Sequence, residues 1–418
     1  MRPEAVVHQA GHLLKVIFTS SKSADRIIDS YFRKNRIGQK ERAIVGDVVY
    51  SAIRQQKRFF AMLKDIKITS IPTYIQLAGA AYAAREDFTP KMLAQLLGVA
   101  SNTTINNQFT PLSELDLYQQ VSLPEWLLEE FVKQWGIDEA HKLGLALNDK
   151  PQVDLRVNSR AISRAQAQAV LRDEGVECEF TPYSQDGLRL TSRYALTGLE
   201  IFKRGDLEIQ EEGSQLISQL LNPYPGNTII DLCAGGGGKS LHLATIMDDK
   251  GQVIATDINA KRLNPLKERQ KRAKLKSISI LLIRHEGDAK LRRFTGVANG
   301  VLVDAPCSGT GTIRRNPEIK WRLTPEQLFV YQQKQGALLD AGARLVKKGG
   351  RLVYATCSLL ACENQEIVKD FLKHNGGFEL LDANREIEGL PHDGPFLTLL
   401  PHKTNSDGFF AAAFKRKK

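Results

Sequence analysis

The sequence has few of the residues that build disulfide frameworks or metal centres. It contains five cysteines in 418 residues, Cys178, Cys233, Cys307, Cys357 and Cys362, and no two of them have C-x-x-C spacing. An odd number without that spacing argues against both a disulfide scaffold and a zinc site. This cysteine usage fits a reducing compartment, so we expect a cytoplasmic protein without a metal.

Long apolar runs are also missing. No stretch approaches the ~18 apolar residues of a membrane-spanning helix. The N-terminal stretch MRPEAVVHQAGHLLKVIF carries a glutamate and two histidines and has no small-residue cleavage site, so it does not resemble a signal peptide. No pattern indicates a coiled coil or another oligomer interface. We therefore expect no membrane partner, and a monomer.

Charge is the first positive signal. The formal net charge is +11 and the isoelectric point is about 9.3. Such an excess favours an anionic partner, of which nucleic acid is the commonest, although a basic surface also serves solubility alone. The length is sufficient for two or three domains.

Three regions of different character follow one another. Residues 1–145 have apolar residues at helical spacing, with a break near Ile37–Gly38, and predict an all-α domain. Its basic side chains suit either an RNA-contacting module or a solvated bundle, and the sequence leaves both open. Residues 146–205 combine short strands at 152–158, 176–183 and 187–192 with a helix at 163–175, which predicts a small α+β domain.

Residues 206–418 alternate strands and helices. Five strands are predicted at 227–232, 252–257, 278–283, 300–306 and 350–358, each followed by a helical segment or a loop leading to one. This alternation is typical of a parallel sheet covered by helices on both faces. We therefore predict a Rossmann-like α/β domain.

The stretch DLCAGGGGKS, residues 231–240, is the most distinctive in the chain. A Walker A loop needs glycine five positions before Gly238, and that position is Cys233. A G-x-G-x-x-G fingerprint fails as well, because its last position falls on Ser240 or Leu241. Neither a phosphate loop nor a dinucleotide fingerprint is present.

What remains is a strand end, a glycine turn and a helix start carrying Lys239. Such glycines allow a ligand to approach the backbone closely. The next strand ends in Asp257, where a carboxylate suits the two hydroxyls of a ribose; the alternative is a helix N-cap. Asp288, after the third strand, is a candidate for adenine. A ribose site without a phosphate motif predicts S-adenosylmethionine as the cofactor.

Two cysteines follow neighbouring strands of the predicted sheet. Asp304 and Cys307 follow the fourth strand and Cys357 ends the fifth, so all three are expected at the edge that binds the cofactor. A thiolate that adds to carbon 6 of cytosine makes carbon 5 able to attack a methyl group, and a nearby acid stabilises the adduct. Spacing does not decide which cysteine attacks. Cys233 and Cys362 are predicted to be packing residues.

These motifs resemble, in order and spacing, those of the RNA 5-cytosine methyltransferases of the Sun/RsmB/NOP type. The matching stretches are DLCAGGGGKS, ATDI, GDA, DAPCSGTGTIRRNPEIKW, YATCSLLACENQ and DGFFAAAF. Residues 23–54 also resemble the NusB-like helical domain of the RsmB branch, and DLRVN resembles the small domain that precedes the catalytic one. The resemblance therefore covers nearly the whole chain.

The resemblance implies roles for individual residues. Cys357 is then the nucleophile and Cys307 assists release of the methylated base. The cofactor is bound by Cys233, Ala234, Gly235, Gly236, Gly237, Gly238, Lys239, Asp257, Asp288 and Asp304, and Asp304 also lies near the base. The family usually has proline at Gly236 and more often alanine at Gly235. We therefore expect a more flexible loop and weaker cofactor binding with the same chemistry.

The resemblance also implies the substrate, small-subunit (16S) ribosomal RNA. Alternatives are a tRNA methyltransferase and a non-catalytic RNA-binding assembly factor, against which the intact Cys357, Cys307 and Asp304 argue. A DNA methyltransferase attacks with the cysteine of its PC motif, and a nicotinamide-dependent oxidoreductase is disfavoured by the failed fingerprint. The basic segment GTIRRNPEIKWR, residues 311–322, is predicted to contact the RNA backbone; the alternative is a solvated loop anchored by Trp321.

Overall fold

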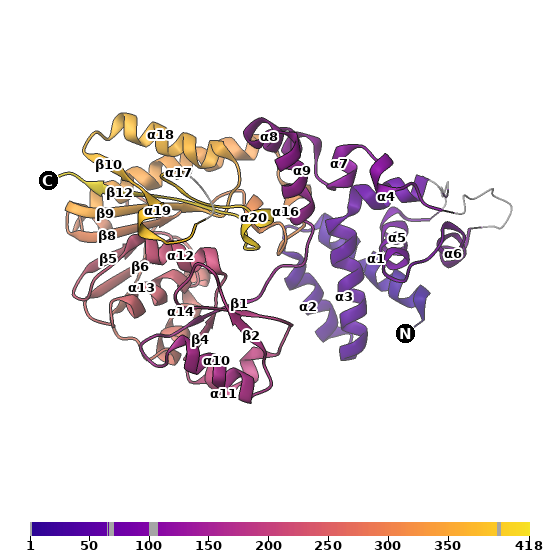
Figure 1. Ribbon diagram of the computed structural model, residues 1–418, viewed down its shortest axis with the longest axis horizontal. Helices are drawn as coiled ribbons and strands as arrows, with labels where there is room; N and C mark the ends of the chain where they lie inside the picture. Colours follow the sequence, from indigo (N-terminus) through magenta and orange to yellow (C-terminus); the bar gives the residue numbers. More distant parts are fainter. Residues whose placement is uncertain (1, 65, 67–70, 100–107, 391–393) are drawn as a thin grey trace. The chain divides into compact units, whose positions relative to one another are not determined.

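The computed structural model describes residues 2–64, 66, 71–99, 108–390 and 394–418. Contacts within the chain divide it into two units. The first comprises Met1–Lys150 with Thr312–Leu323, and the second comprises Pro151–Gly311 with Thr324–Lys418 (Figure 1). The chain thus leaves the second unit after Gly311 and returns to it at Thr324.

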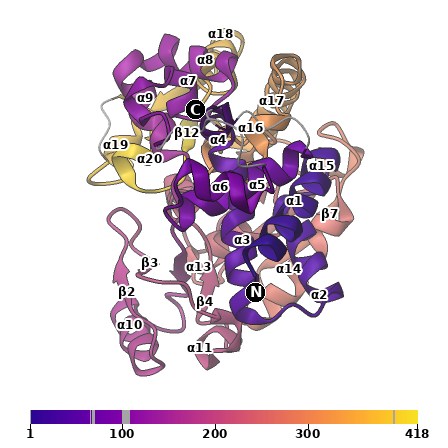
Figure 2. The same cartoon turned by 90° about the vertical axis from the view of Figure 1, so that its right-hand side faces the viewer.

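The first unit is helical in the part of the chain that the structure describes, as predicted. Its longer helices are α1 (Pro3–Thr19), α2 (Ala24–Lys34), α3 (Gln39–Arg54), α4 (Gln56–Lys64), α5 (Thr73–Arg85), α6 (Pro90–Leu96), α8 (Glu125–Trp135) and α9 (Ile137–Ala146), and α7 (Leu117–Gln120) is a single turn. The gap between α2 and α3 contains the predicted break. Helices α1, α3 and α5 lie side by side and bury Leu14, Val49 and Ala80 completely (Figure 2).

Among the described helices, none combines the length and apolar character that crossing a bilayer requires. The most hydrophobic of the helices in the first unit instead bury one face on their neighbours, as α1 does with Leu13 and Ile17.

The segment Thr312–Leu323, which we call the strap, packs into the helical unit although it lies within the predicted catalytic region. Lys320 Nζ donates to the carbonyl of Arg54 at 2.6 Å and to Asn148 Oδ1 at 2.7 Å, and Trp321 Nε1 donates to the carbonyl of Ile53 at 2.7 Å. Lys320 is fully buried, and Arg314 is 2% exposed. The prediction that these two residues contact RNA phosphates is therefore wrong, because both side chains are buried and the ammonium group of Lys320 is bonded within the helical unit.

The smaller sheet of the second unit has the strand order β2-β3-β1-β4, all antiparallel. Its strands are β1 (Asp154–Val157), β2 (Cys178–Phe180), β3 (Gly187–Leu190) and β4 (Leu207–Ile209), with α10 (Arg164–Asp173) and α11 (Glu200–Lys203) packed against them. The first three strands and α10 were predicted. Strand β4 lies beyond the predicted boundary at 205/206, yet it pairs with β1. In this pairing Leu155 lies opposite Ile209.

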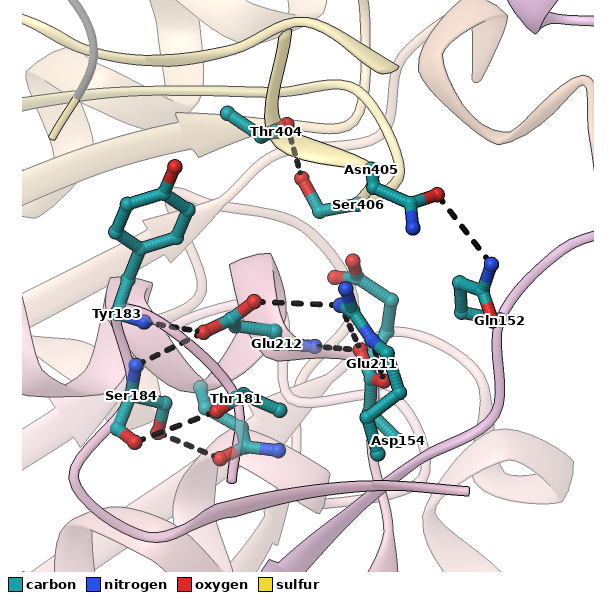
Figure 3. Close-up of polar contacts among 12 residues, drawn as sticks. Gln152, Asp154, Thr181, Tyr183, Ser184, Glu211, Glu212, Thr404, Asn405 and Ser406 are labelled. Carbon is teal, nitrogen blue, oxygen red and sulfur yellow. Dashed lines mark hydrogen bonds and ion pairs between the residues drawn. The ribbon is translucent and has the colours of Figure 1, made fainter. Parts of the chain in front are cut away.

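A buried polar network fixes this sheet to helix α12 (Glu212–Leu221) (Figure 3). Glu212 Oε1 accepts from the backbone N–H groups of Tyr183 and Ser184 at 2.7 and 2.9 Å, and Asp154 Oδ2 accepts from the N–H of Glu212 at 3.0 Å. Arg189 pairs with both carboxylates. Buried charges that are hydrogen-bonded on several sides hold a specific geometry, so the smaller sheet has a defined position on α12.

The larger sheet has the order β10-β12-β9-β8-β5-β6-β7, and β11 pairs with β12. Its strands are β5 (Thr228–Asp231), β6 (Gln252–Asp257), β7 (Ile278–Leu282), β8 (Ala298–Asp304), β9 (Val346–Thr356), β10 (Phe378–Leu381), β11 (Leu397–Leu399) and β12 (Phe409–Arg416). The five predicted strands are β5 to β9, and they are parallel to one another. The antiparallel edge formed by β10 to β12 was not predicted.

Helices cover both faces of the larger sheet, as predicted. Helices α12, α13 (Gly238–Ile246) and α14 (Ala260–Arg272) lie on one face, and α17 (Pro325–Leu345) and α18 (Gln365–His374) lie on the other (Figure 1). The short turns α15 (Ala289–Arg292), α19 (Ala383–Glu386) and α20 (Pro401–Thr404) belong to the same unit, whereas α16 (Ile319–Arg322) lies in the strap. The second unit thus contains a Rossmann-like fold, whose ligand edge lies at the carboxyl ends of the parallel strands.

Candidate active site

A cavity of about 670 Å³ opens at the carboxyl ends of β5, β6, β8 and β9. Its lining includes five of the predicted site residues: Cys233, Asp257, Asp304, Cys307 and Cys357. This volume is within the usual range of ligand pockets, roughly 300–1,000 Å³. The parallel topology therefore brings together residues that are 124 positions apart in the sequence, from Cys233 to Cys357.

The glycine loop forms a tight cradle between β5 and α13. Gly235 and Gly237 have φ values of +54° and +78°, which favour glycine. A Cβ atom on Gly235 would lie 2.9 Å from Arg262 Nη2, and one on Gly237 would lie 2.2 Å from Leu266 Cδ1. Gly237 thus excludes a larger side chain, whereas the exposed end of Arg262 has room to move away from one at Gly235. Of the described loop, Cys233 lines the cavity, whereas Ala234 and Gly235–Gly238 form the backbone beside it.

Asp257 ends β6 and borders the cavity while 4% exposed. Its carboxylate accepts from the N–H of Gly235 at 3.0 Å and from the N–H of Asn259 at 2.8 Å, so it connects the glycine loop to the start of α14. The N-cap of α14 is Asn259, whose side chain accepts from the N–H of Lys261. The alternative assignment of Asp257 as that helix cap is therefore wrong, and the carboxylate faces the ligand cavity.

Asp288 does not line the cavity with the other predicted residues. Its carboxylate accepts from the N–H groups of Lys290 and Arg284 at 2.9 and 2.8 Å, which lowers its pKa. The residues that line this end of the cavity are its neighbours, Ile283 to Glu286. The structure thus gives Asp288 the position of a residue that holds this turn, and direct contact with adenine stays a prediction.

The two cysteine sulfur atoms lie 3.4 Å apart. The hydrogen bond with Cys357, followed by burial, raises the pKa of Cys307 well above its ordinary value. Either sulfur atom can donate in this contact, so the geometry does not distinguish the two thiols. A thiolate is the reactive form of cysteine, and two thiols in contact at this edge suit covalent chemistry.

Asp304 forms an ion pair with Lys239, whose Nζ lies 2.7 Å from Asp304 Oδ2. Burial alone would lower the pKa of Lys239, but the Asp304 carboxylate outweighs burial and raises it, with smaller contributions from Asp231 and Cys357. Lys239 is therefore a fixed cation beside both Asp304 and the candidate nucleophile. The ammonium group of Lys239 thus points to the Asp304 carboxylate at the carboxyl end of β8.

Glu363, for which the sequence motifs predict no role, connects the loop that carries Cys307 to the loop that carries Cys357. It is fully buried, and its carboxylate accepts from the N–H and hydroxyl of Ser308 and from the hydroxyl of Ser358, the residues that follow Cys307 and Cys357. Gln335 on α17 donates to the same carboxylate at 2.9 Å. The only sequence signal was the position of Glu363 inside the stretch YATCSLLACENQ.

The remaining cysteines have different surroundings. Burial raises the pKa of Cys233, which packs among apolar residues, as expected. Cys178 is on β2 of the smaller sheet. No cluster of at least three metal-ligating side chains occurs in the described part of the chain.

Comparisons with known proteins agree with this geometry. A model of the 16S rRNA methyltransferase RsmB/F family matches residues 218–415, and a model of the ferredoxin-like domain of RsmF/B-like methyltransferases matches residues 123–197. The chain is 30% identical to "Probable ribosomal RNA small subunit methyltransferase B" of Synechocystis sp., covering 97% of this chain and 98% of that protein. It is 34% identical to the protein of the same name in Bacillus subtilis, covering 72% and 68%.

Among solved structures, the crystal structure of PH0851 superposes with a TM-score of 0.79 at 25% identity, covering 100% of this chain and 99% of that one. The likeness thus extends over nearly the whole length of both chains. The family models, together with 30% identity over nearly the full length of a relative, show that the chain belongs to the RsmB/F family of 16S rRNA methyltransferases.

Proposed function

We propose that this protein methylates carbon 5 of a cytosine in small-subunit ribosomal RNA, with S-adenosylmethionine as the methyl donor. The observation that carries the proposal is the pair of thiols 3.4 Å apart in the cavity that Asp257 and Asp304 also line. The names of the curated relatives support ribosomal RNA as the substrate.

The residues around the cavity fit the proposed cofactor. Gly237 leaves no room for a side chain in the glycine cradle, Asp257 offers a carboxylate to a ribose, and Ile258 and Ile283 add apolar surface for an adenine. The cofactor would supply an electrophilic methyl group. Predicted contacts of Ala234, Gly235–Gly238, Lys239 and Asp288 with it remain part of this proposal.

In the proposed reaction, Cys357 Sγ forms a bond to carbon 6 of the cytosine. The electron pair moves toward carbon 5, and Asp304, near ring nitrogen 3, stabilises the adduct. Lys239 holds Asp304 in place and supplies positive charge near the thiolate. After methylation at carbon 5, loss of the proton from that carbon breaks the bond to Cys357, and Cys307 assists this release.

The other domains complete the proposal. We assign the predicted region 1–145 to a NusB-like helical domain that binds RNA, and 146–205 together with β4 to the small α+β domain. The rest of 206–418, apart from the strap, forms the catalytic domain. Specificity for one cytosine is then achieved by taking an unpaired base out of its stack. We expect a monomer that acts in the cytoplasm.

The experiment uses Cys307→Ala, in which release is impaired while Cys357 remains. This variant is mixed with protein-free small-subunit RNA and S-adenosylmethionine and run on a denaturing gel. We expect a covalent protein–RNA band that is absent with Cys307→Ala/Cys357→Ala. Cys178→Ala is the matched control, because its thiol is on the smaller sheet and should leave turnover unchanged.

Three other outcomes would contradict parts of the proposal. A band that survives in the absence of Cys357 would make another residue the nucleophile. Transfer to purified tRNA but not to ribosomal RNA would change the substrate class. Absence of both a band and methyl transfer by the wild-type protein, with either RNA and with assembled small subunits, would support the non-catalytic alternative.

A further inference from the structure

Two arginine side chains donate hydrogen bonds to backbone carbonyl groups of the glycine loop, and neither has a role in the proposed reaction. Arg269 of α14 donates from Nη1 to the carbonyl oxygen of Gly236 at 2.5 Å. Arg156 of β1 donates from Nη1 to the carbonyl oxygen of Gly238 at 2.7 Å. The two arginines thus hold alternate residues of the loop, one from the catalytic fold and one from the smaller sheet.

Glu208 of β4 fixes the first of these arginines. Its Oε2 lies 3.3 Å from Arg269 Nε and 3.0 Å from Arg269 Nη2, and its Oε1 pairs with Arg272. Two contacts to one carboxylate oxygen, together with the bond to Gly236, leave the Arg269 guanidinium little freedom. Charge-assisted hydrogen bonds of this kind are stronger than those between neutral groups.

The smaller sheet places its two charges side by side. Arg156 and Glu208 are directly opposite one another in the register of β1 and β4. They are 3% and 4% exposed, respectively. Burial lowers the pKa of Arg156 to about 10, with Glu208 acting in the opposite direction, so the guanidinium remains charged at neutral pH. Strand pairing in the smaller sheet therefore sets where Arg156 meets the loop and where Glu208 meets Arg269.

The loop has a particular need for such support at Gly236. This residue lies between Gly235 and Gly237, which both have positive φ, in a run of four glycines. Glycine loses more backbone freedom on ordering than any other residue, and the expected proline is absent from this position. External hydrogen bonds to Gly236 and Gly238 restrict the same backbone without a ring.

We propose that Arg269, Glu208 and Arg156 are positioning residues that hold the glycine loop ready for the methyl donor, so that the smaller sheet contributes to donor affinity. The identity of the donor rests on the proposed function. The assignment gives β1 and β4 a role in cofactor binding in addition to their own packing.

The test uses the full-length chain and the variant Arg269→Gln. Its matched control is Lys271→Gln, an exposed cation on the same helix. Hydrogen–deuterium exchange of the free protein should show faster exchange across residues 233–241 in Arg269→Gln only. Calorimetric titration with S-adenosylmethionine should show a roughly five- to fiftyfold higher Kd, since a hydrogen bond to a charged group is lost. Glu208→Gln should have a smaller effect in the same direction.

A second substitution separates loop positioning from a merely structural role. Gly236→Pro restricts the loop by another means, and a Cβ there would lie 3.4 Å from Arg269 Nη1, at the limit of ordinary contact. In the Arg269→Gln background it should return the Kd to within about threefold of wild type. A Kd that Gly236→Pro does not restore would overturn the proposal, because Arg269 would then act through something other than loop order.

The two proposals fail in different ways. If wild-type protein binds no S-adenosylmethionine, the proposed function fails and the predicted effect on donor affinity fails with it, while the exchange measurement still decides whether the loop is held. If wild type binds the donor and Arg269→Gln changes neither exchange nor Kd, the positioning role alone is overturned.

Discussion

At the scale of single residues, the active-site edge depends on a few buried polar groups with shifted proton affinity. Asp231, at the end of β5, is 1% exposed and accepts from the hydroxyl of Ser240 at 2.6 Å. Burial raises its pKa to about 7, and the nearby carboxylates of Asp304 and Asp257 act in the same direction. Three carboxyl groups, those of Asp231, Asp257 and Asp304, therefore lie close together at the ends of β5, β6 and β8.

The raised pKa of Asp231 predicts a pH dependence of stability. In the unfolded chain this carboxyl ionises near its ordinary pKa, so its contribution to stability is fully present below that value and is lost as pH rises through about 7. Asp231→Asn should therefore gain stability over wild type between pH 5 and pH 8, by roughly 2–3 kcal/mol. Denaturant unfolding at several pH values measures the difference. Asp173 is exposed, so the difference in free energy of unfolding between Asp173→Asn and wild type should not change with pH. If that difference also stays constant with pH for Asp231→Asn, the prediction is contradicted.

Gly311 illustrates a backbone requirement at the same edge. Its N–H donates to the carbonyl of Cys357 at 2.9 Å, and its own carbonyl accepts from the N–H of Gly408 at 2.8 Å. A Cβ atom on Gly311 would lie 2.1 Å from the carbonyl oxygen of Gly408. Glycine at this position thus permits the turn at Gly311, the loop that carries Cys357 and the start of β12 to meet.

Gly311→Ala should force these backbones apart. We expect a loss of stability of ~1–3 kcal/mol from overpacking and a fall in kcat of at least about tenfold, because the Cys357 loop shifts. The control is Gly336→Ala on α17, where nothing lies within 4 Å and alanine should stabilise the helix by ~0.5–1 kcal/mol. Methyl-transfer kinetics and thermal unfolding are measured for both variants. If Gly311→Ala and Gly336→Ala have the same kcat and the same stability, the backbone requirement at Gly311 is refuted.

At the scale of elements, the strap is the segment whose position in the structure differs most from the prediction made from the sequence. It begins one residue after Gly311 and packs on the helical unit, where Ala24 N–H donates to Glu318 Oε1 at 3.0 Å and Arg322 donates to the carbonyl of Ile17 at 2.6 Å. Burial, followed by the charge of Arg54, lowers the pKa of Lys320 well below its ordinary value. An element of the catalytic sequence thus completes the helical unit.

Truncating the strap's aromatic anchor should destabilise the helical unit. Trp321→Ala removes packing against the core of α1 to α5 as well as the hydrogen bond to Ile53, and should cost about 3 kcal/mol. Trp321→Phe keeps most of the packing and should cost about 1 kcal/mol. Hydrogen exchange in α1 and α3 measures the effect. Unchanged protection in Trp321→Ala would show that the helical unit does not depend on the strap.

At the scale of the whole molecule, the charge of +11 predicts how RNA affinity depends on salt. Each phosphate neutralised by lysine or arginine releases counterions, so binding weakens steeply as salt rises. Raising salt from ~50 to ~200 mM should weaken binding of a small-subunit RNA fragment by at least about tenfold. Fluorescence anisotropy gives the RNA affinity, and calorimetry of the methyl donor in the same buffers is the control. Equal salt sensitivity of both ligands would contradict this expectation.

The sequence alone predicted the parts of the molecule that depend on local pattern. Apolar periodicity gave the all-α region, the break between α2 and α3, and the five parallel strands β5 to β9. Because parallel strands end at one edge, the positions of Cys233, Asp257, Asp304, Cys307 and Cys357 at strand ends were enough to predict that they meet. Topology converts these sequence positions into proximity without any knowledge of side-chain packing.

Tertiary structure decided what local pattern leaves open. Basic residues look alike in sequence whether they are solvated or buried, so only packing shows that Lys320 and Arg314 lie inside the helical unit and that Arg269 turns onto Glu208. The pairing of β4 with β1 and the Glu363 contacts between the two cysteine loops likewise join distant segments. Such contacts depend on burial and on the desolvation of particular polar atoms, which are properties of the folded chain and not of any short stretch of it.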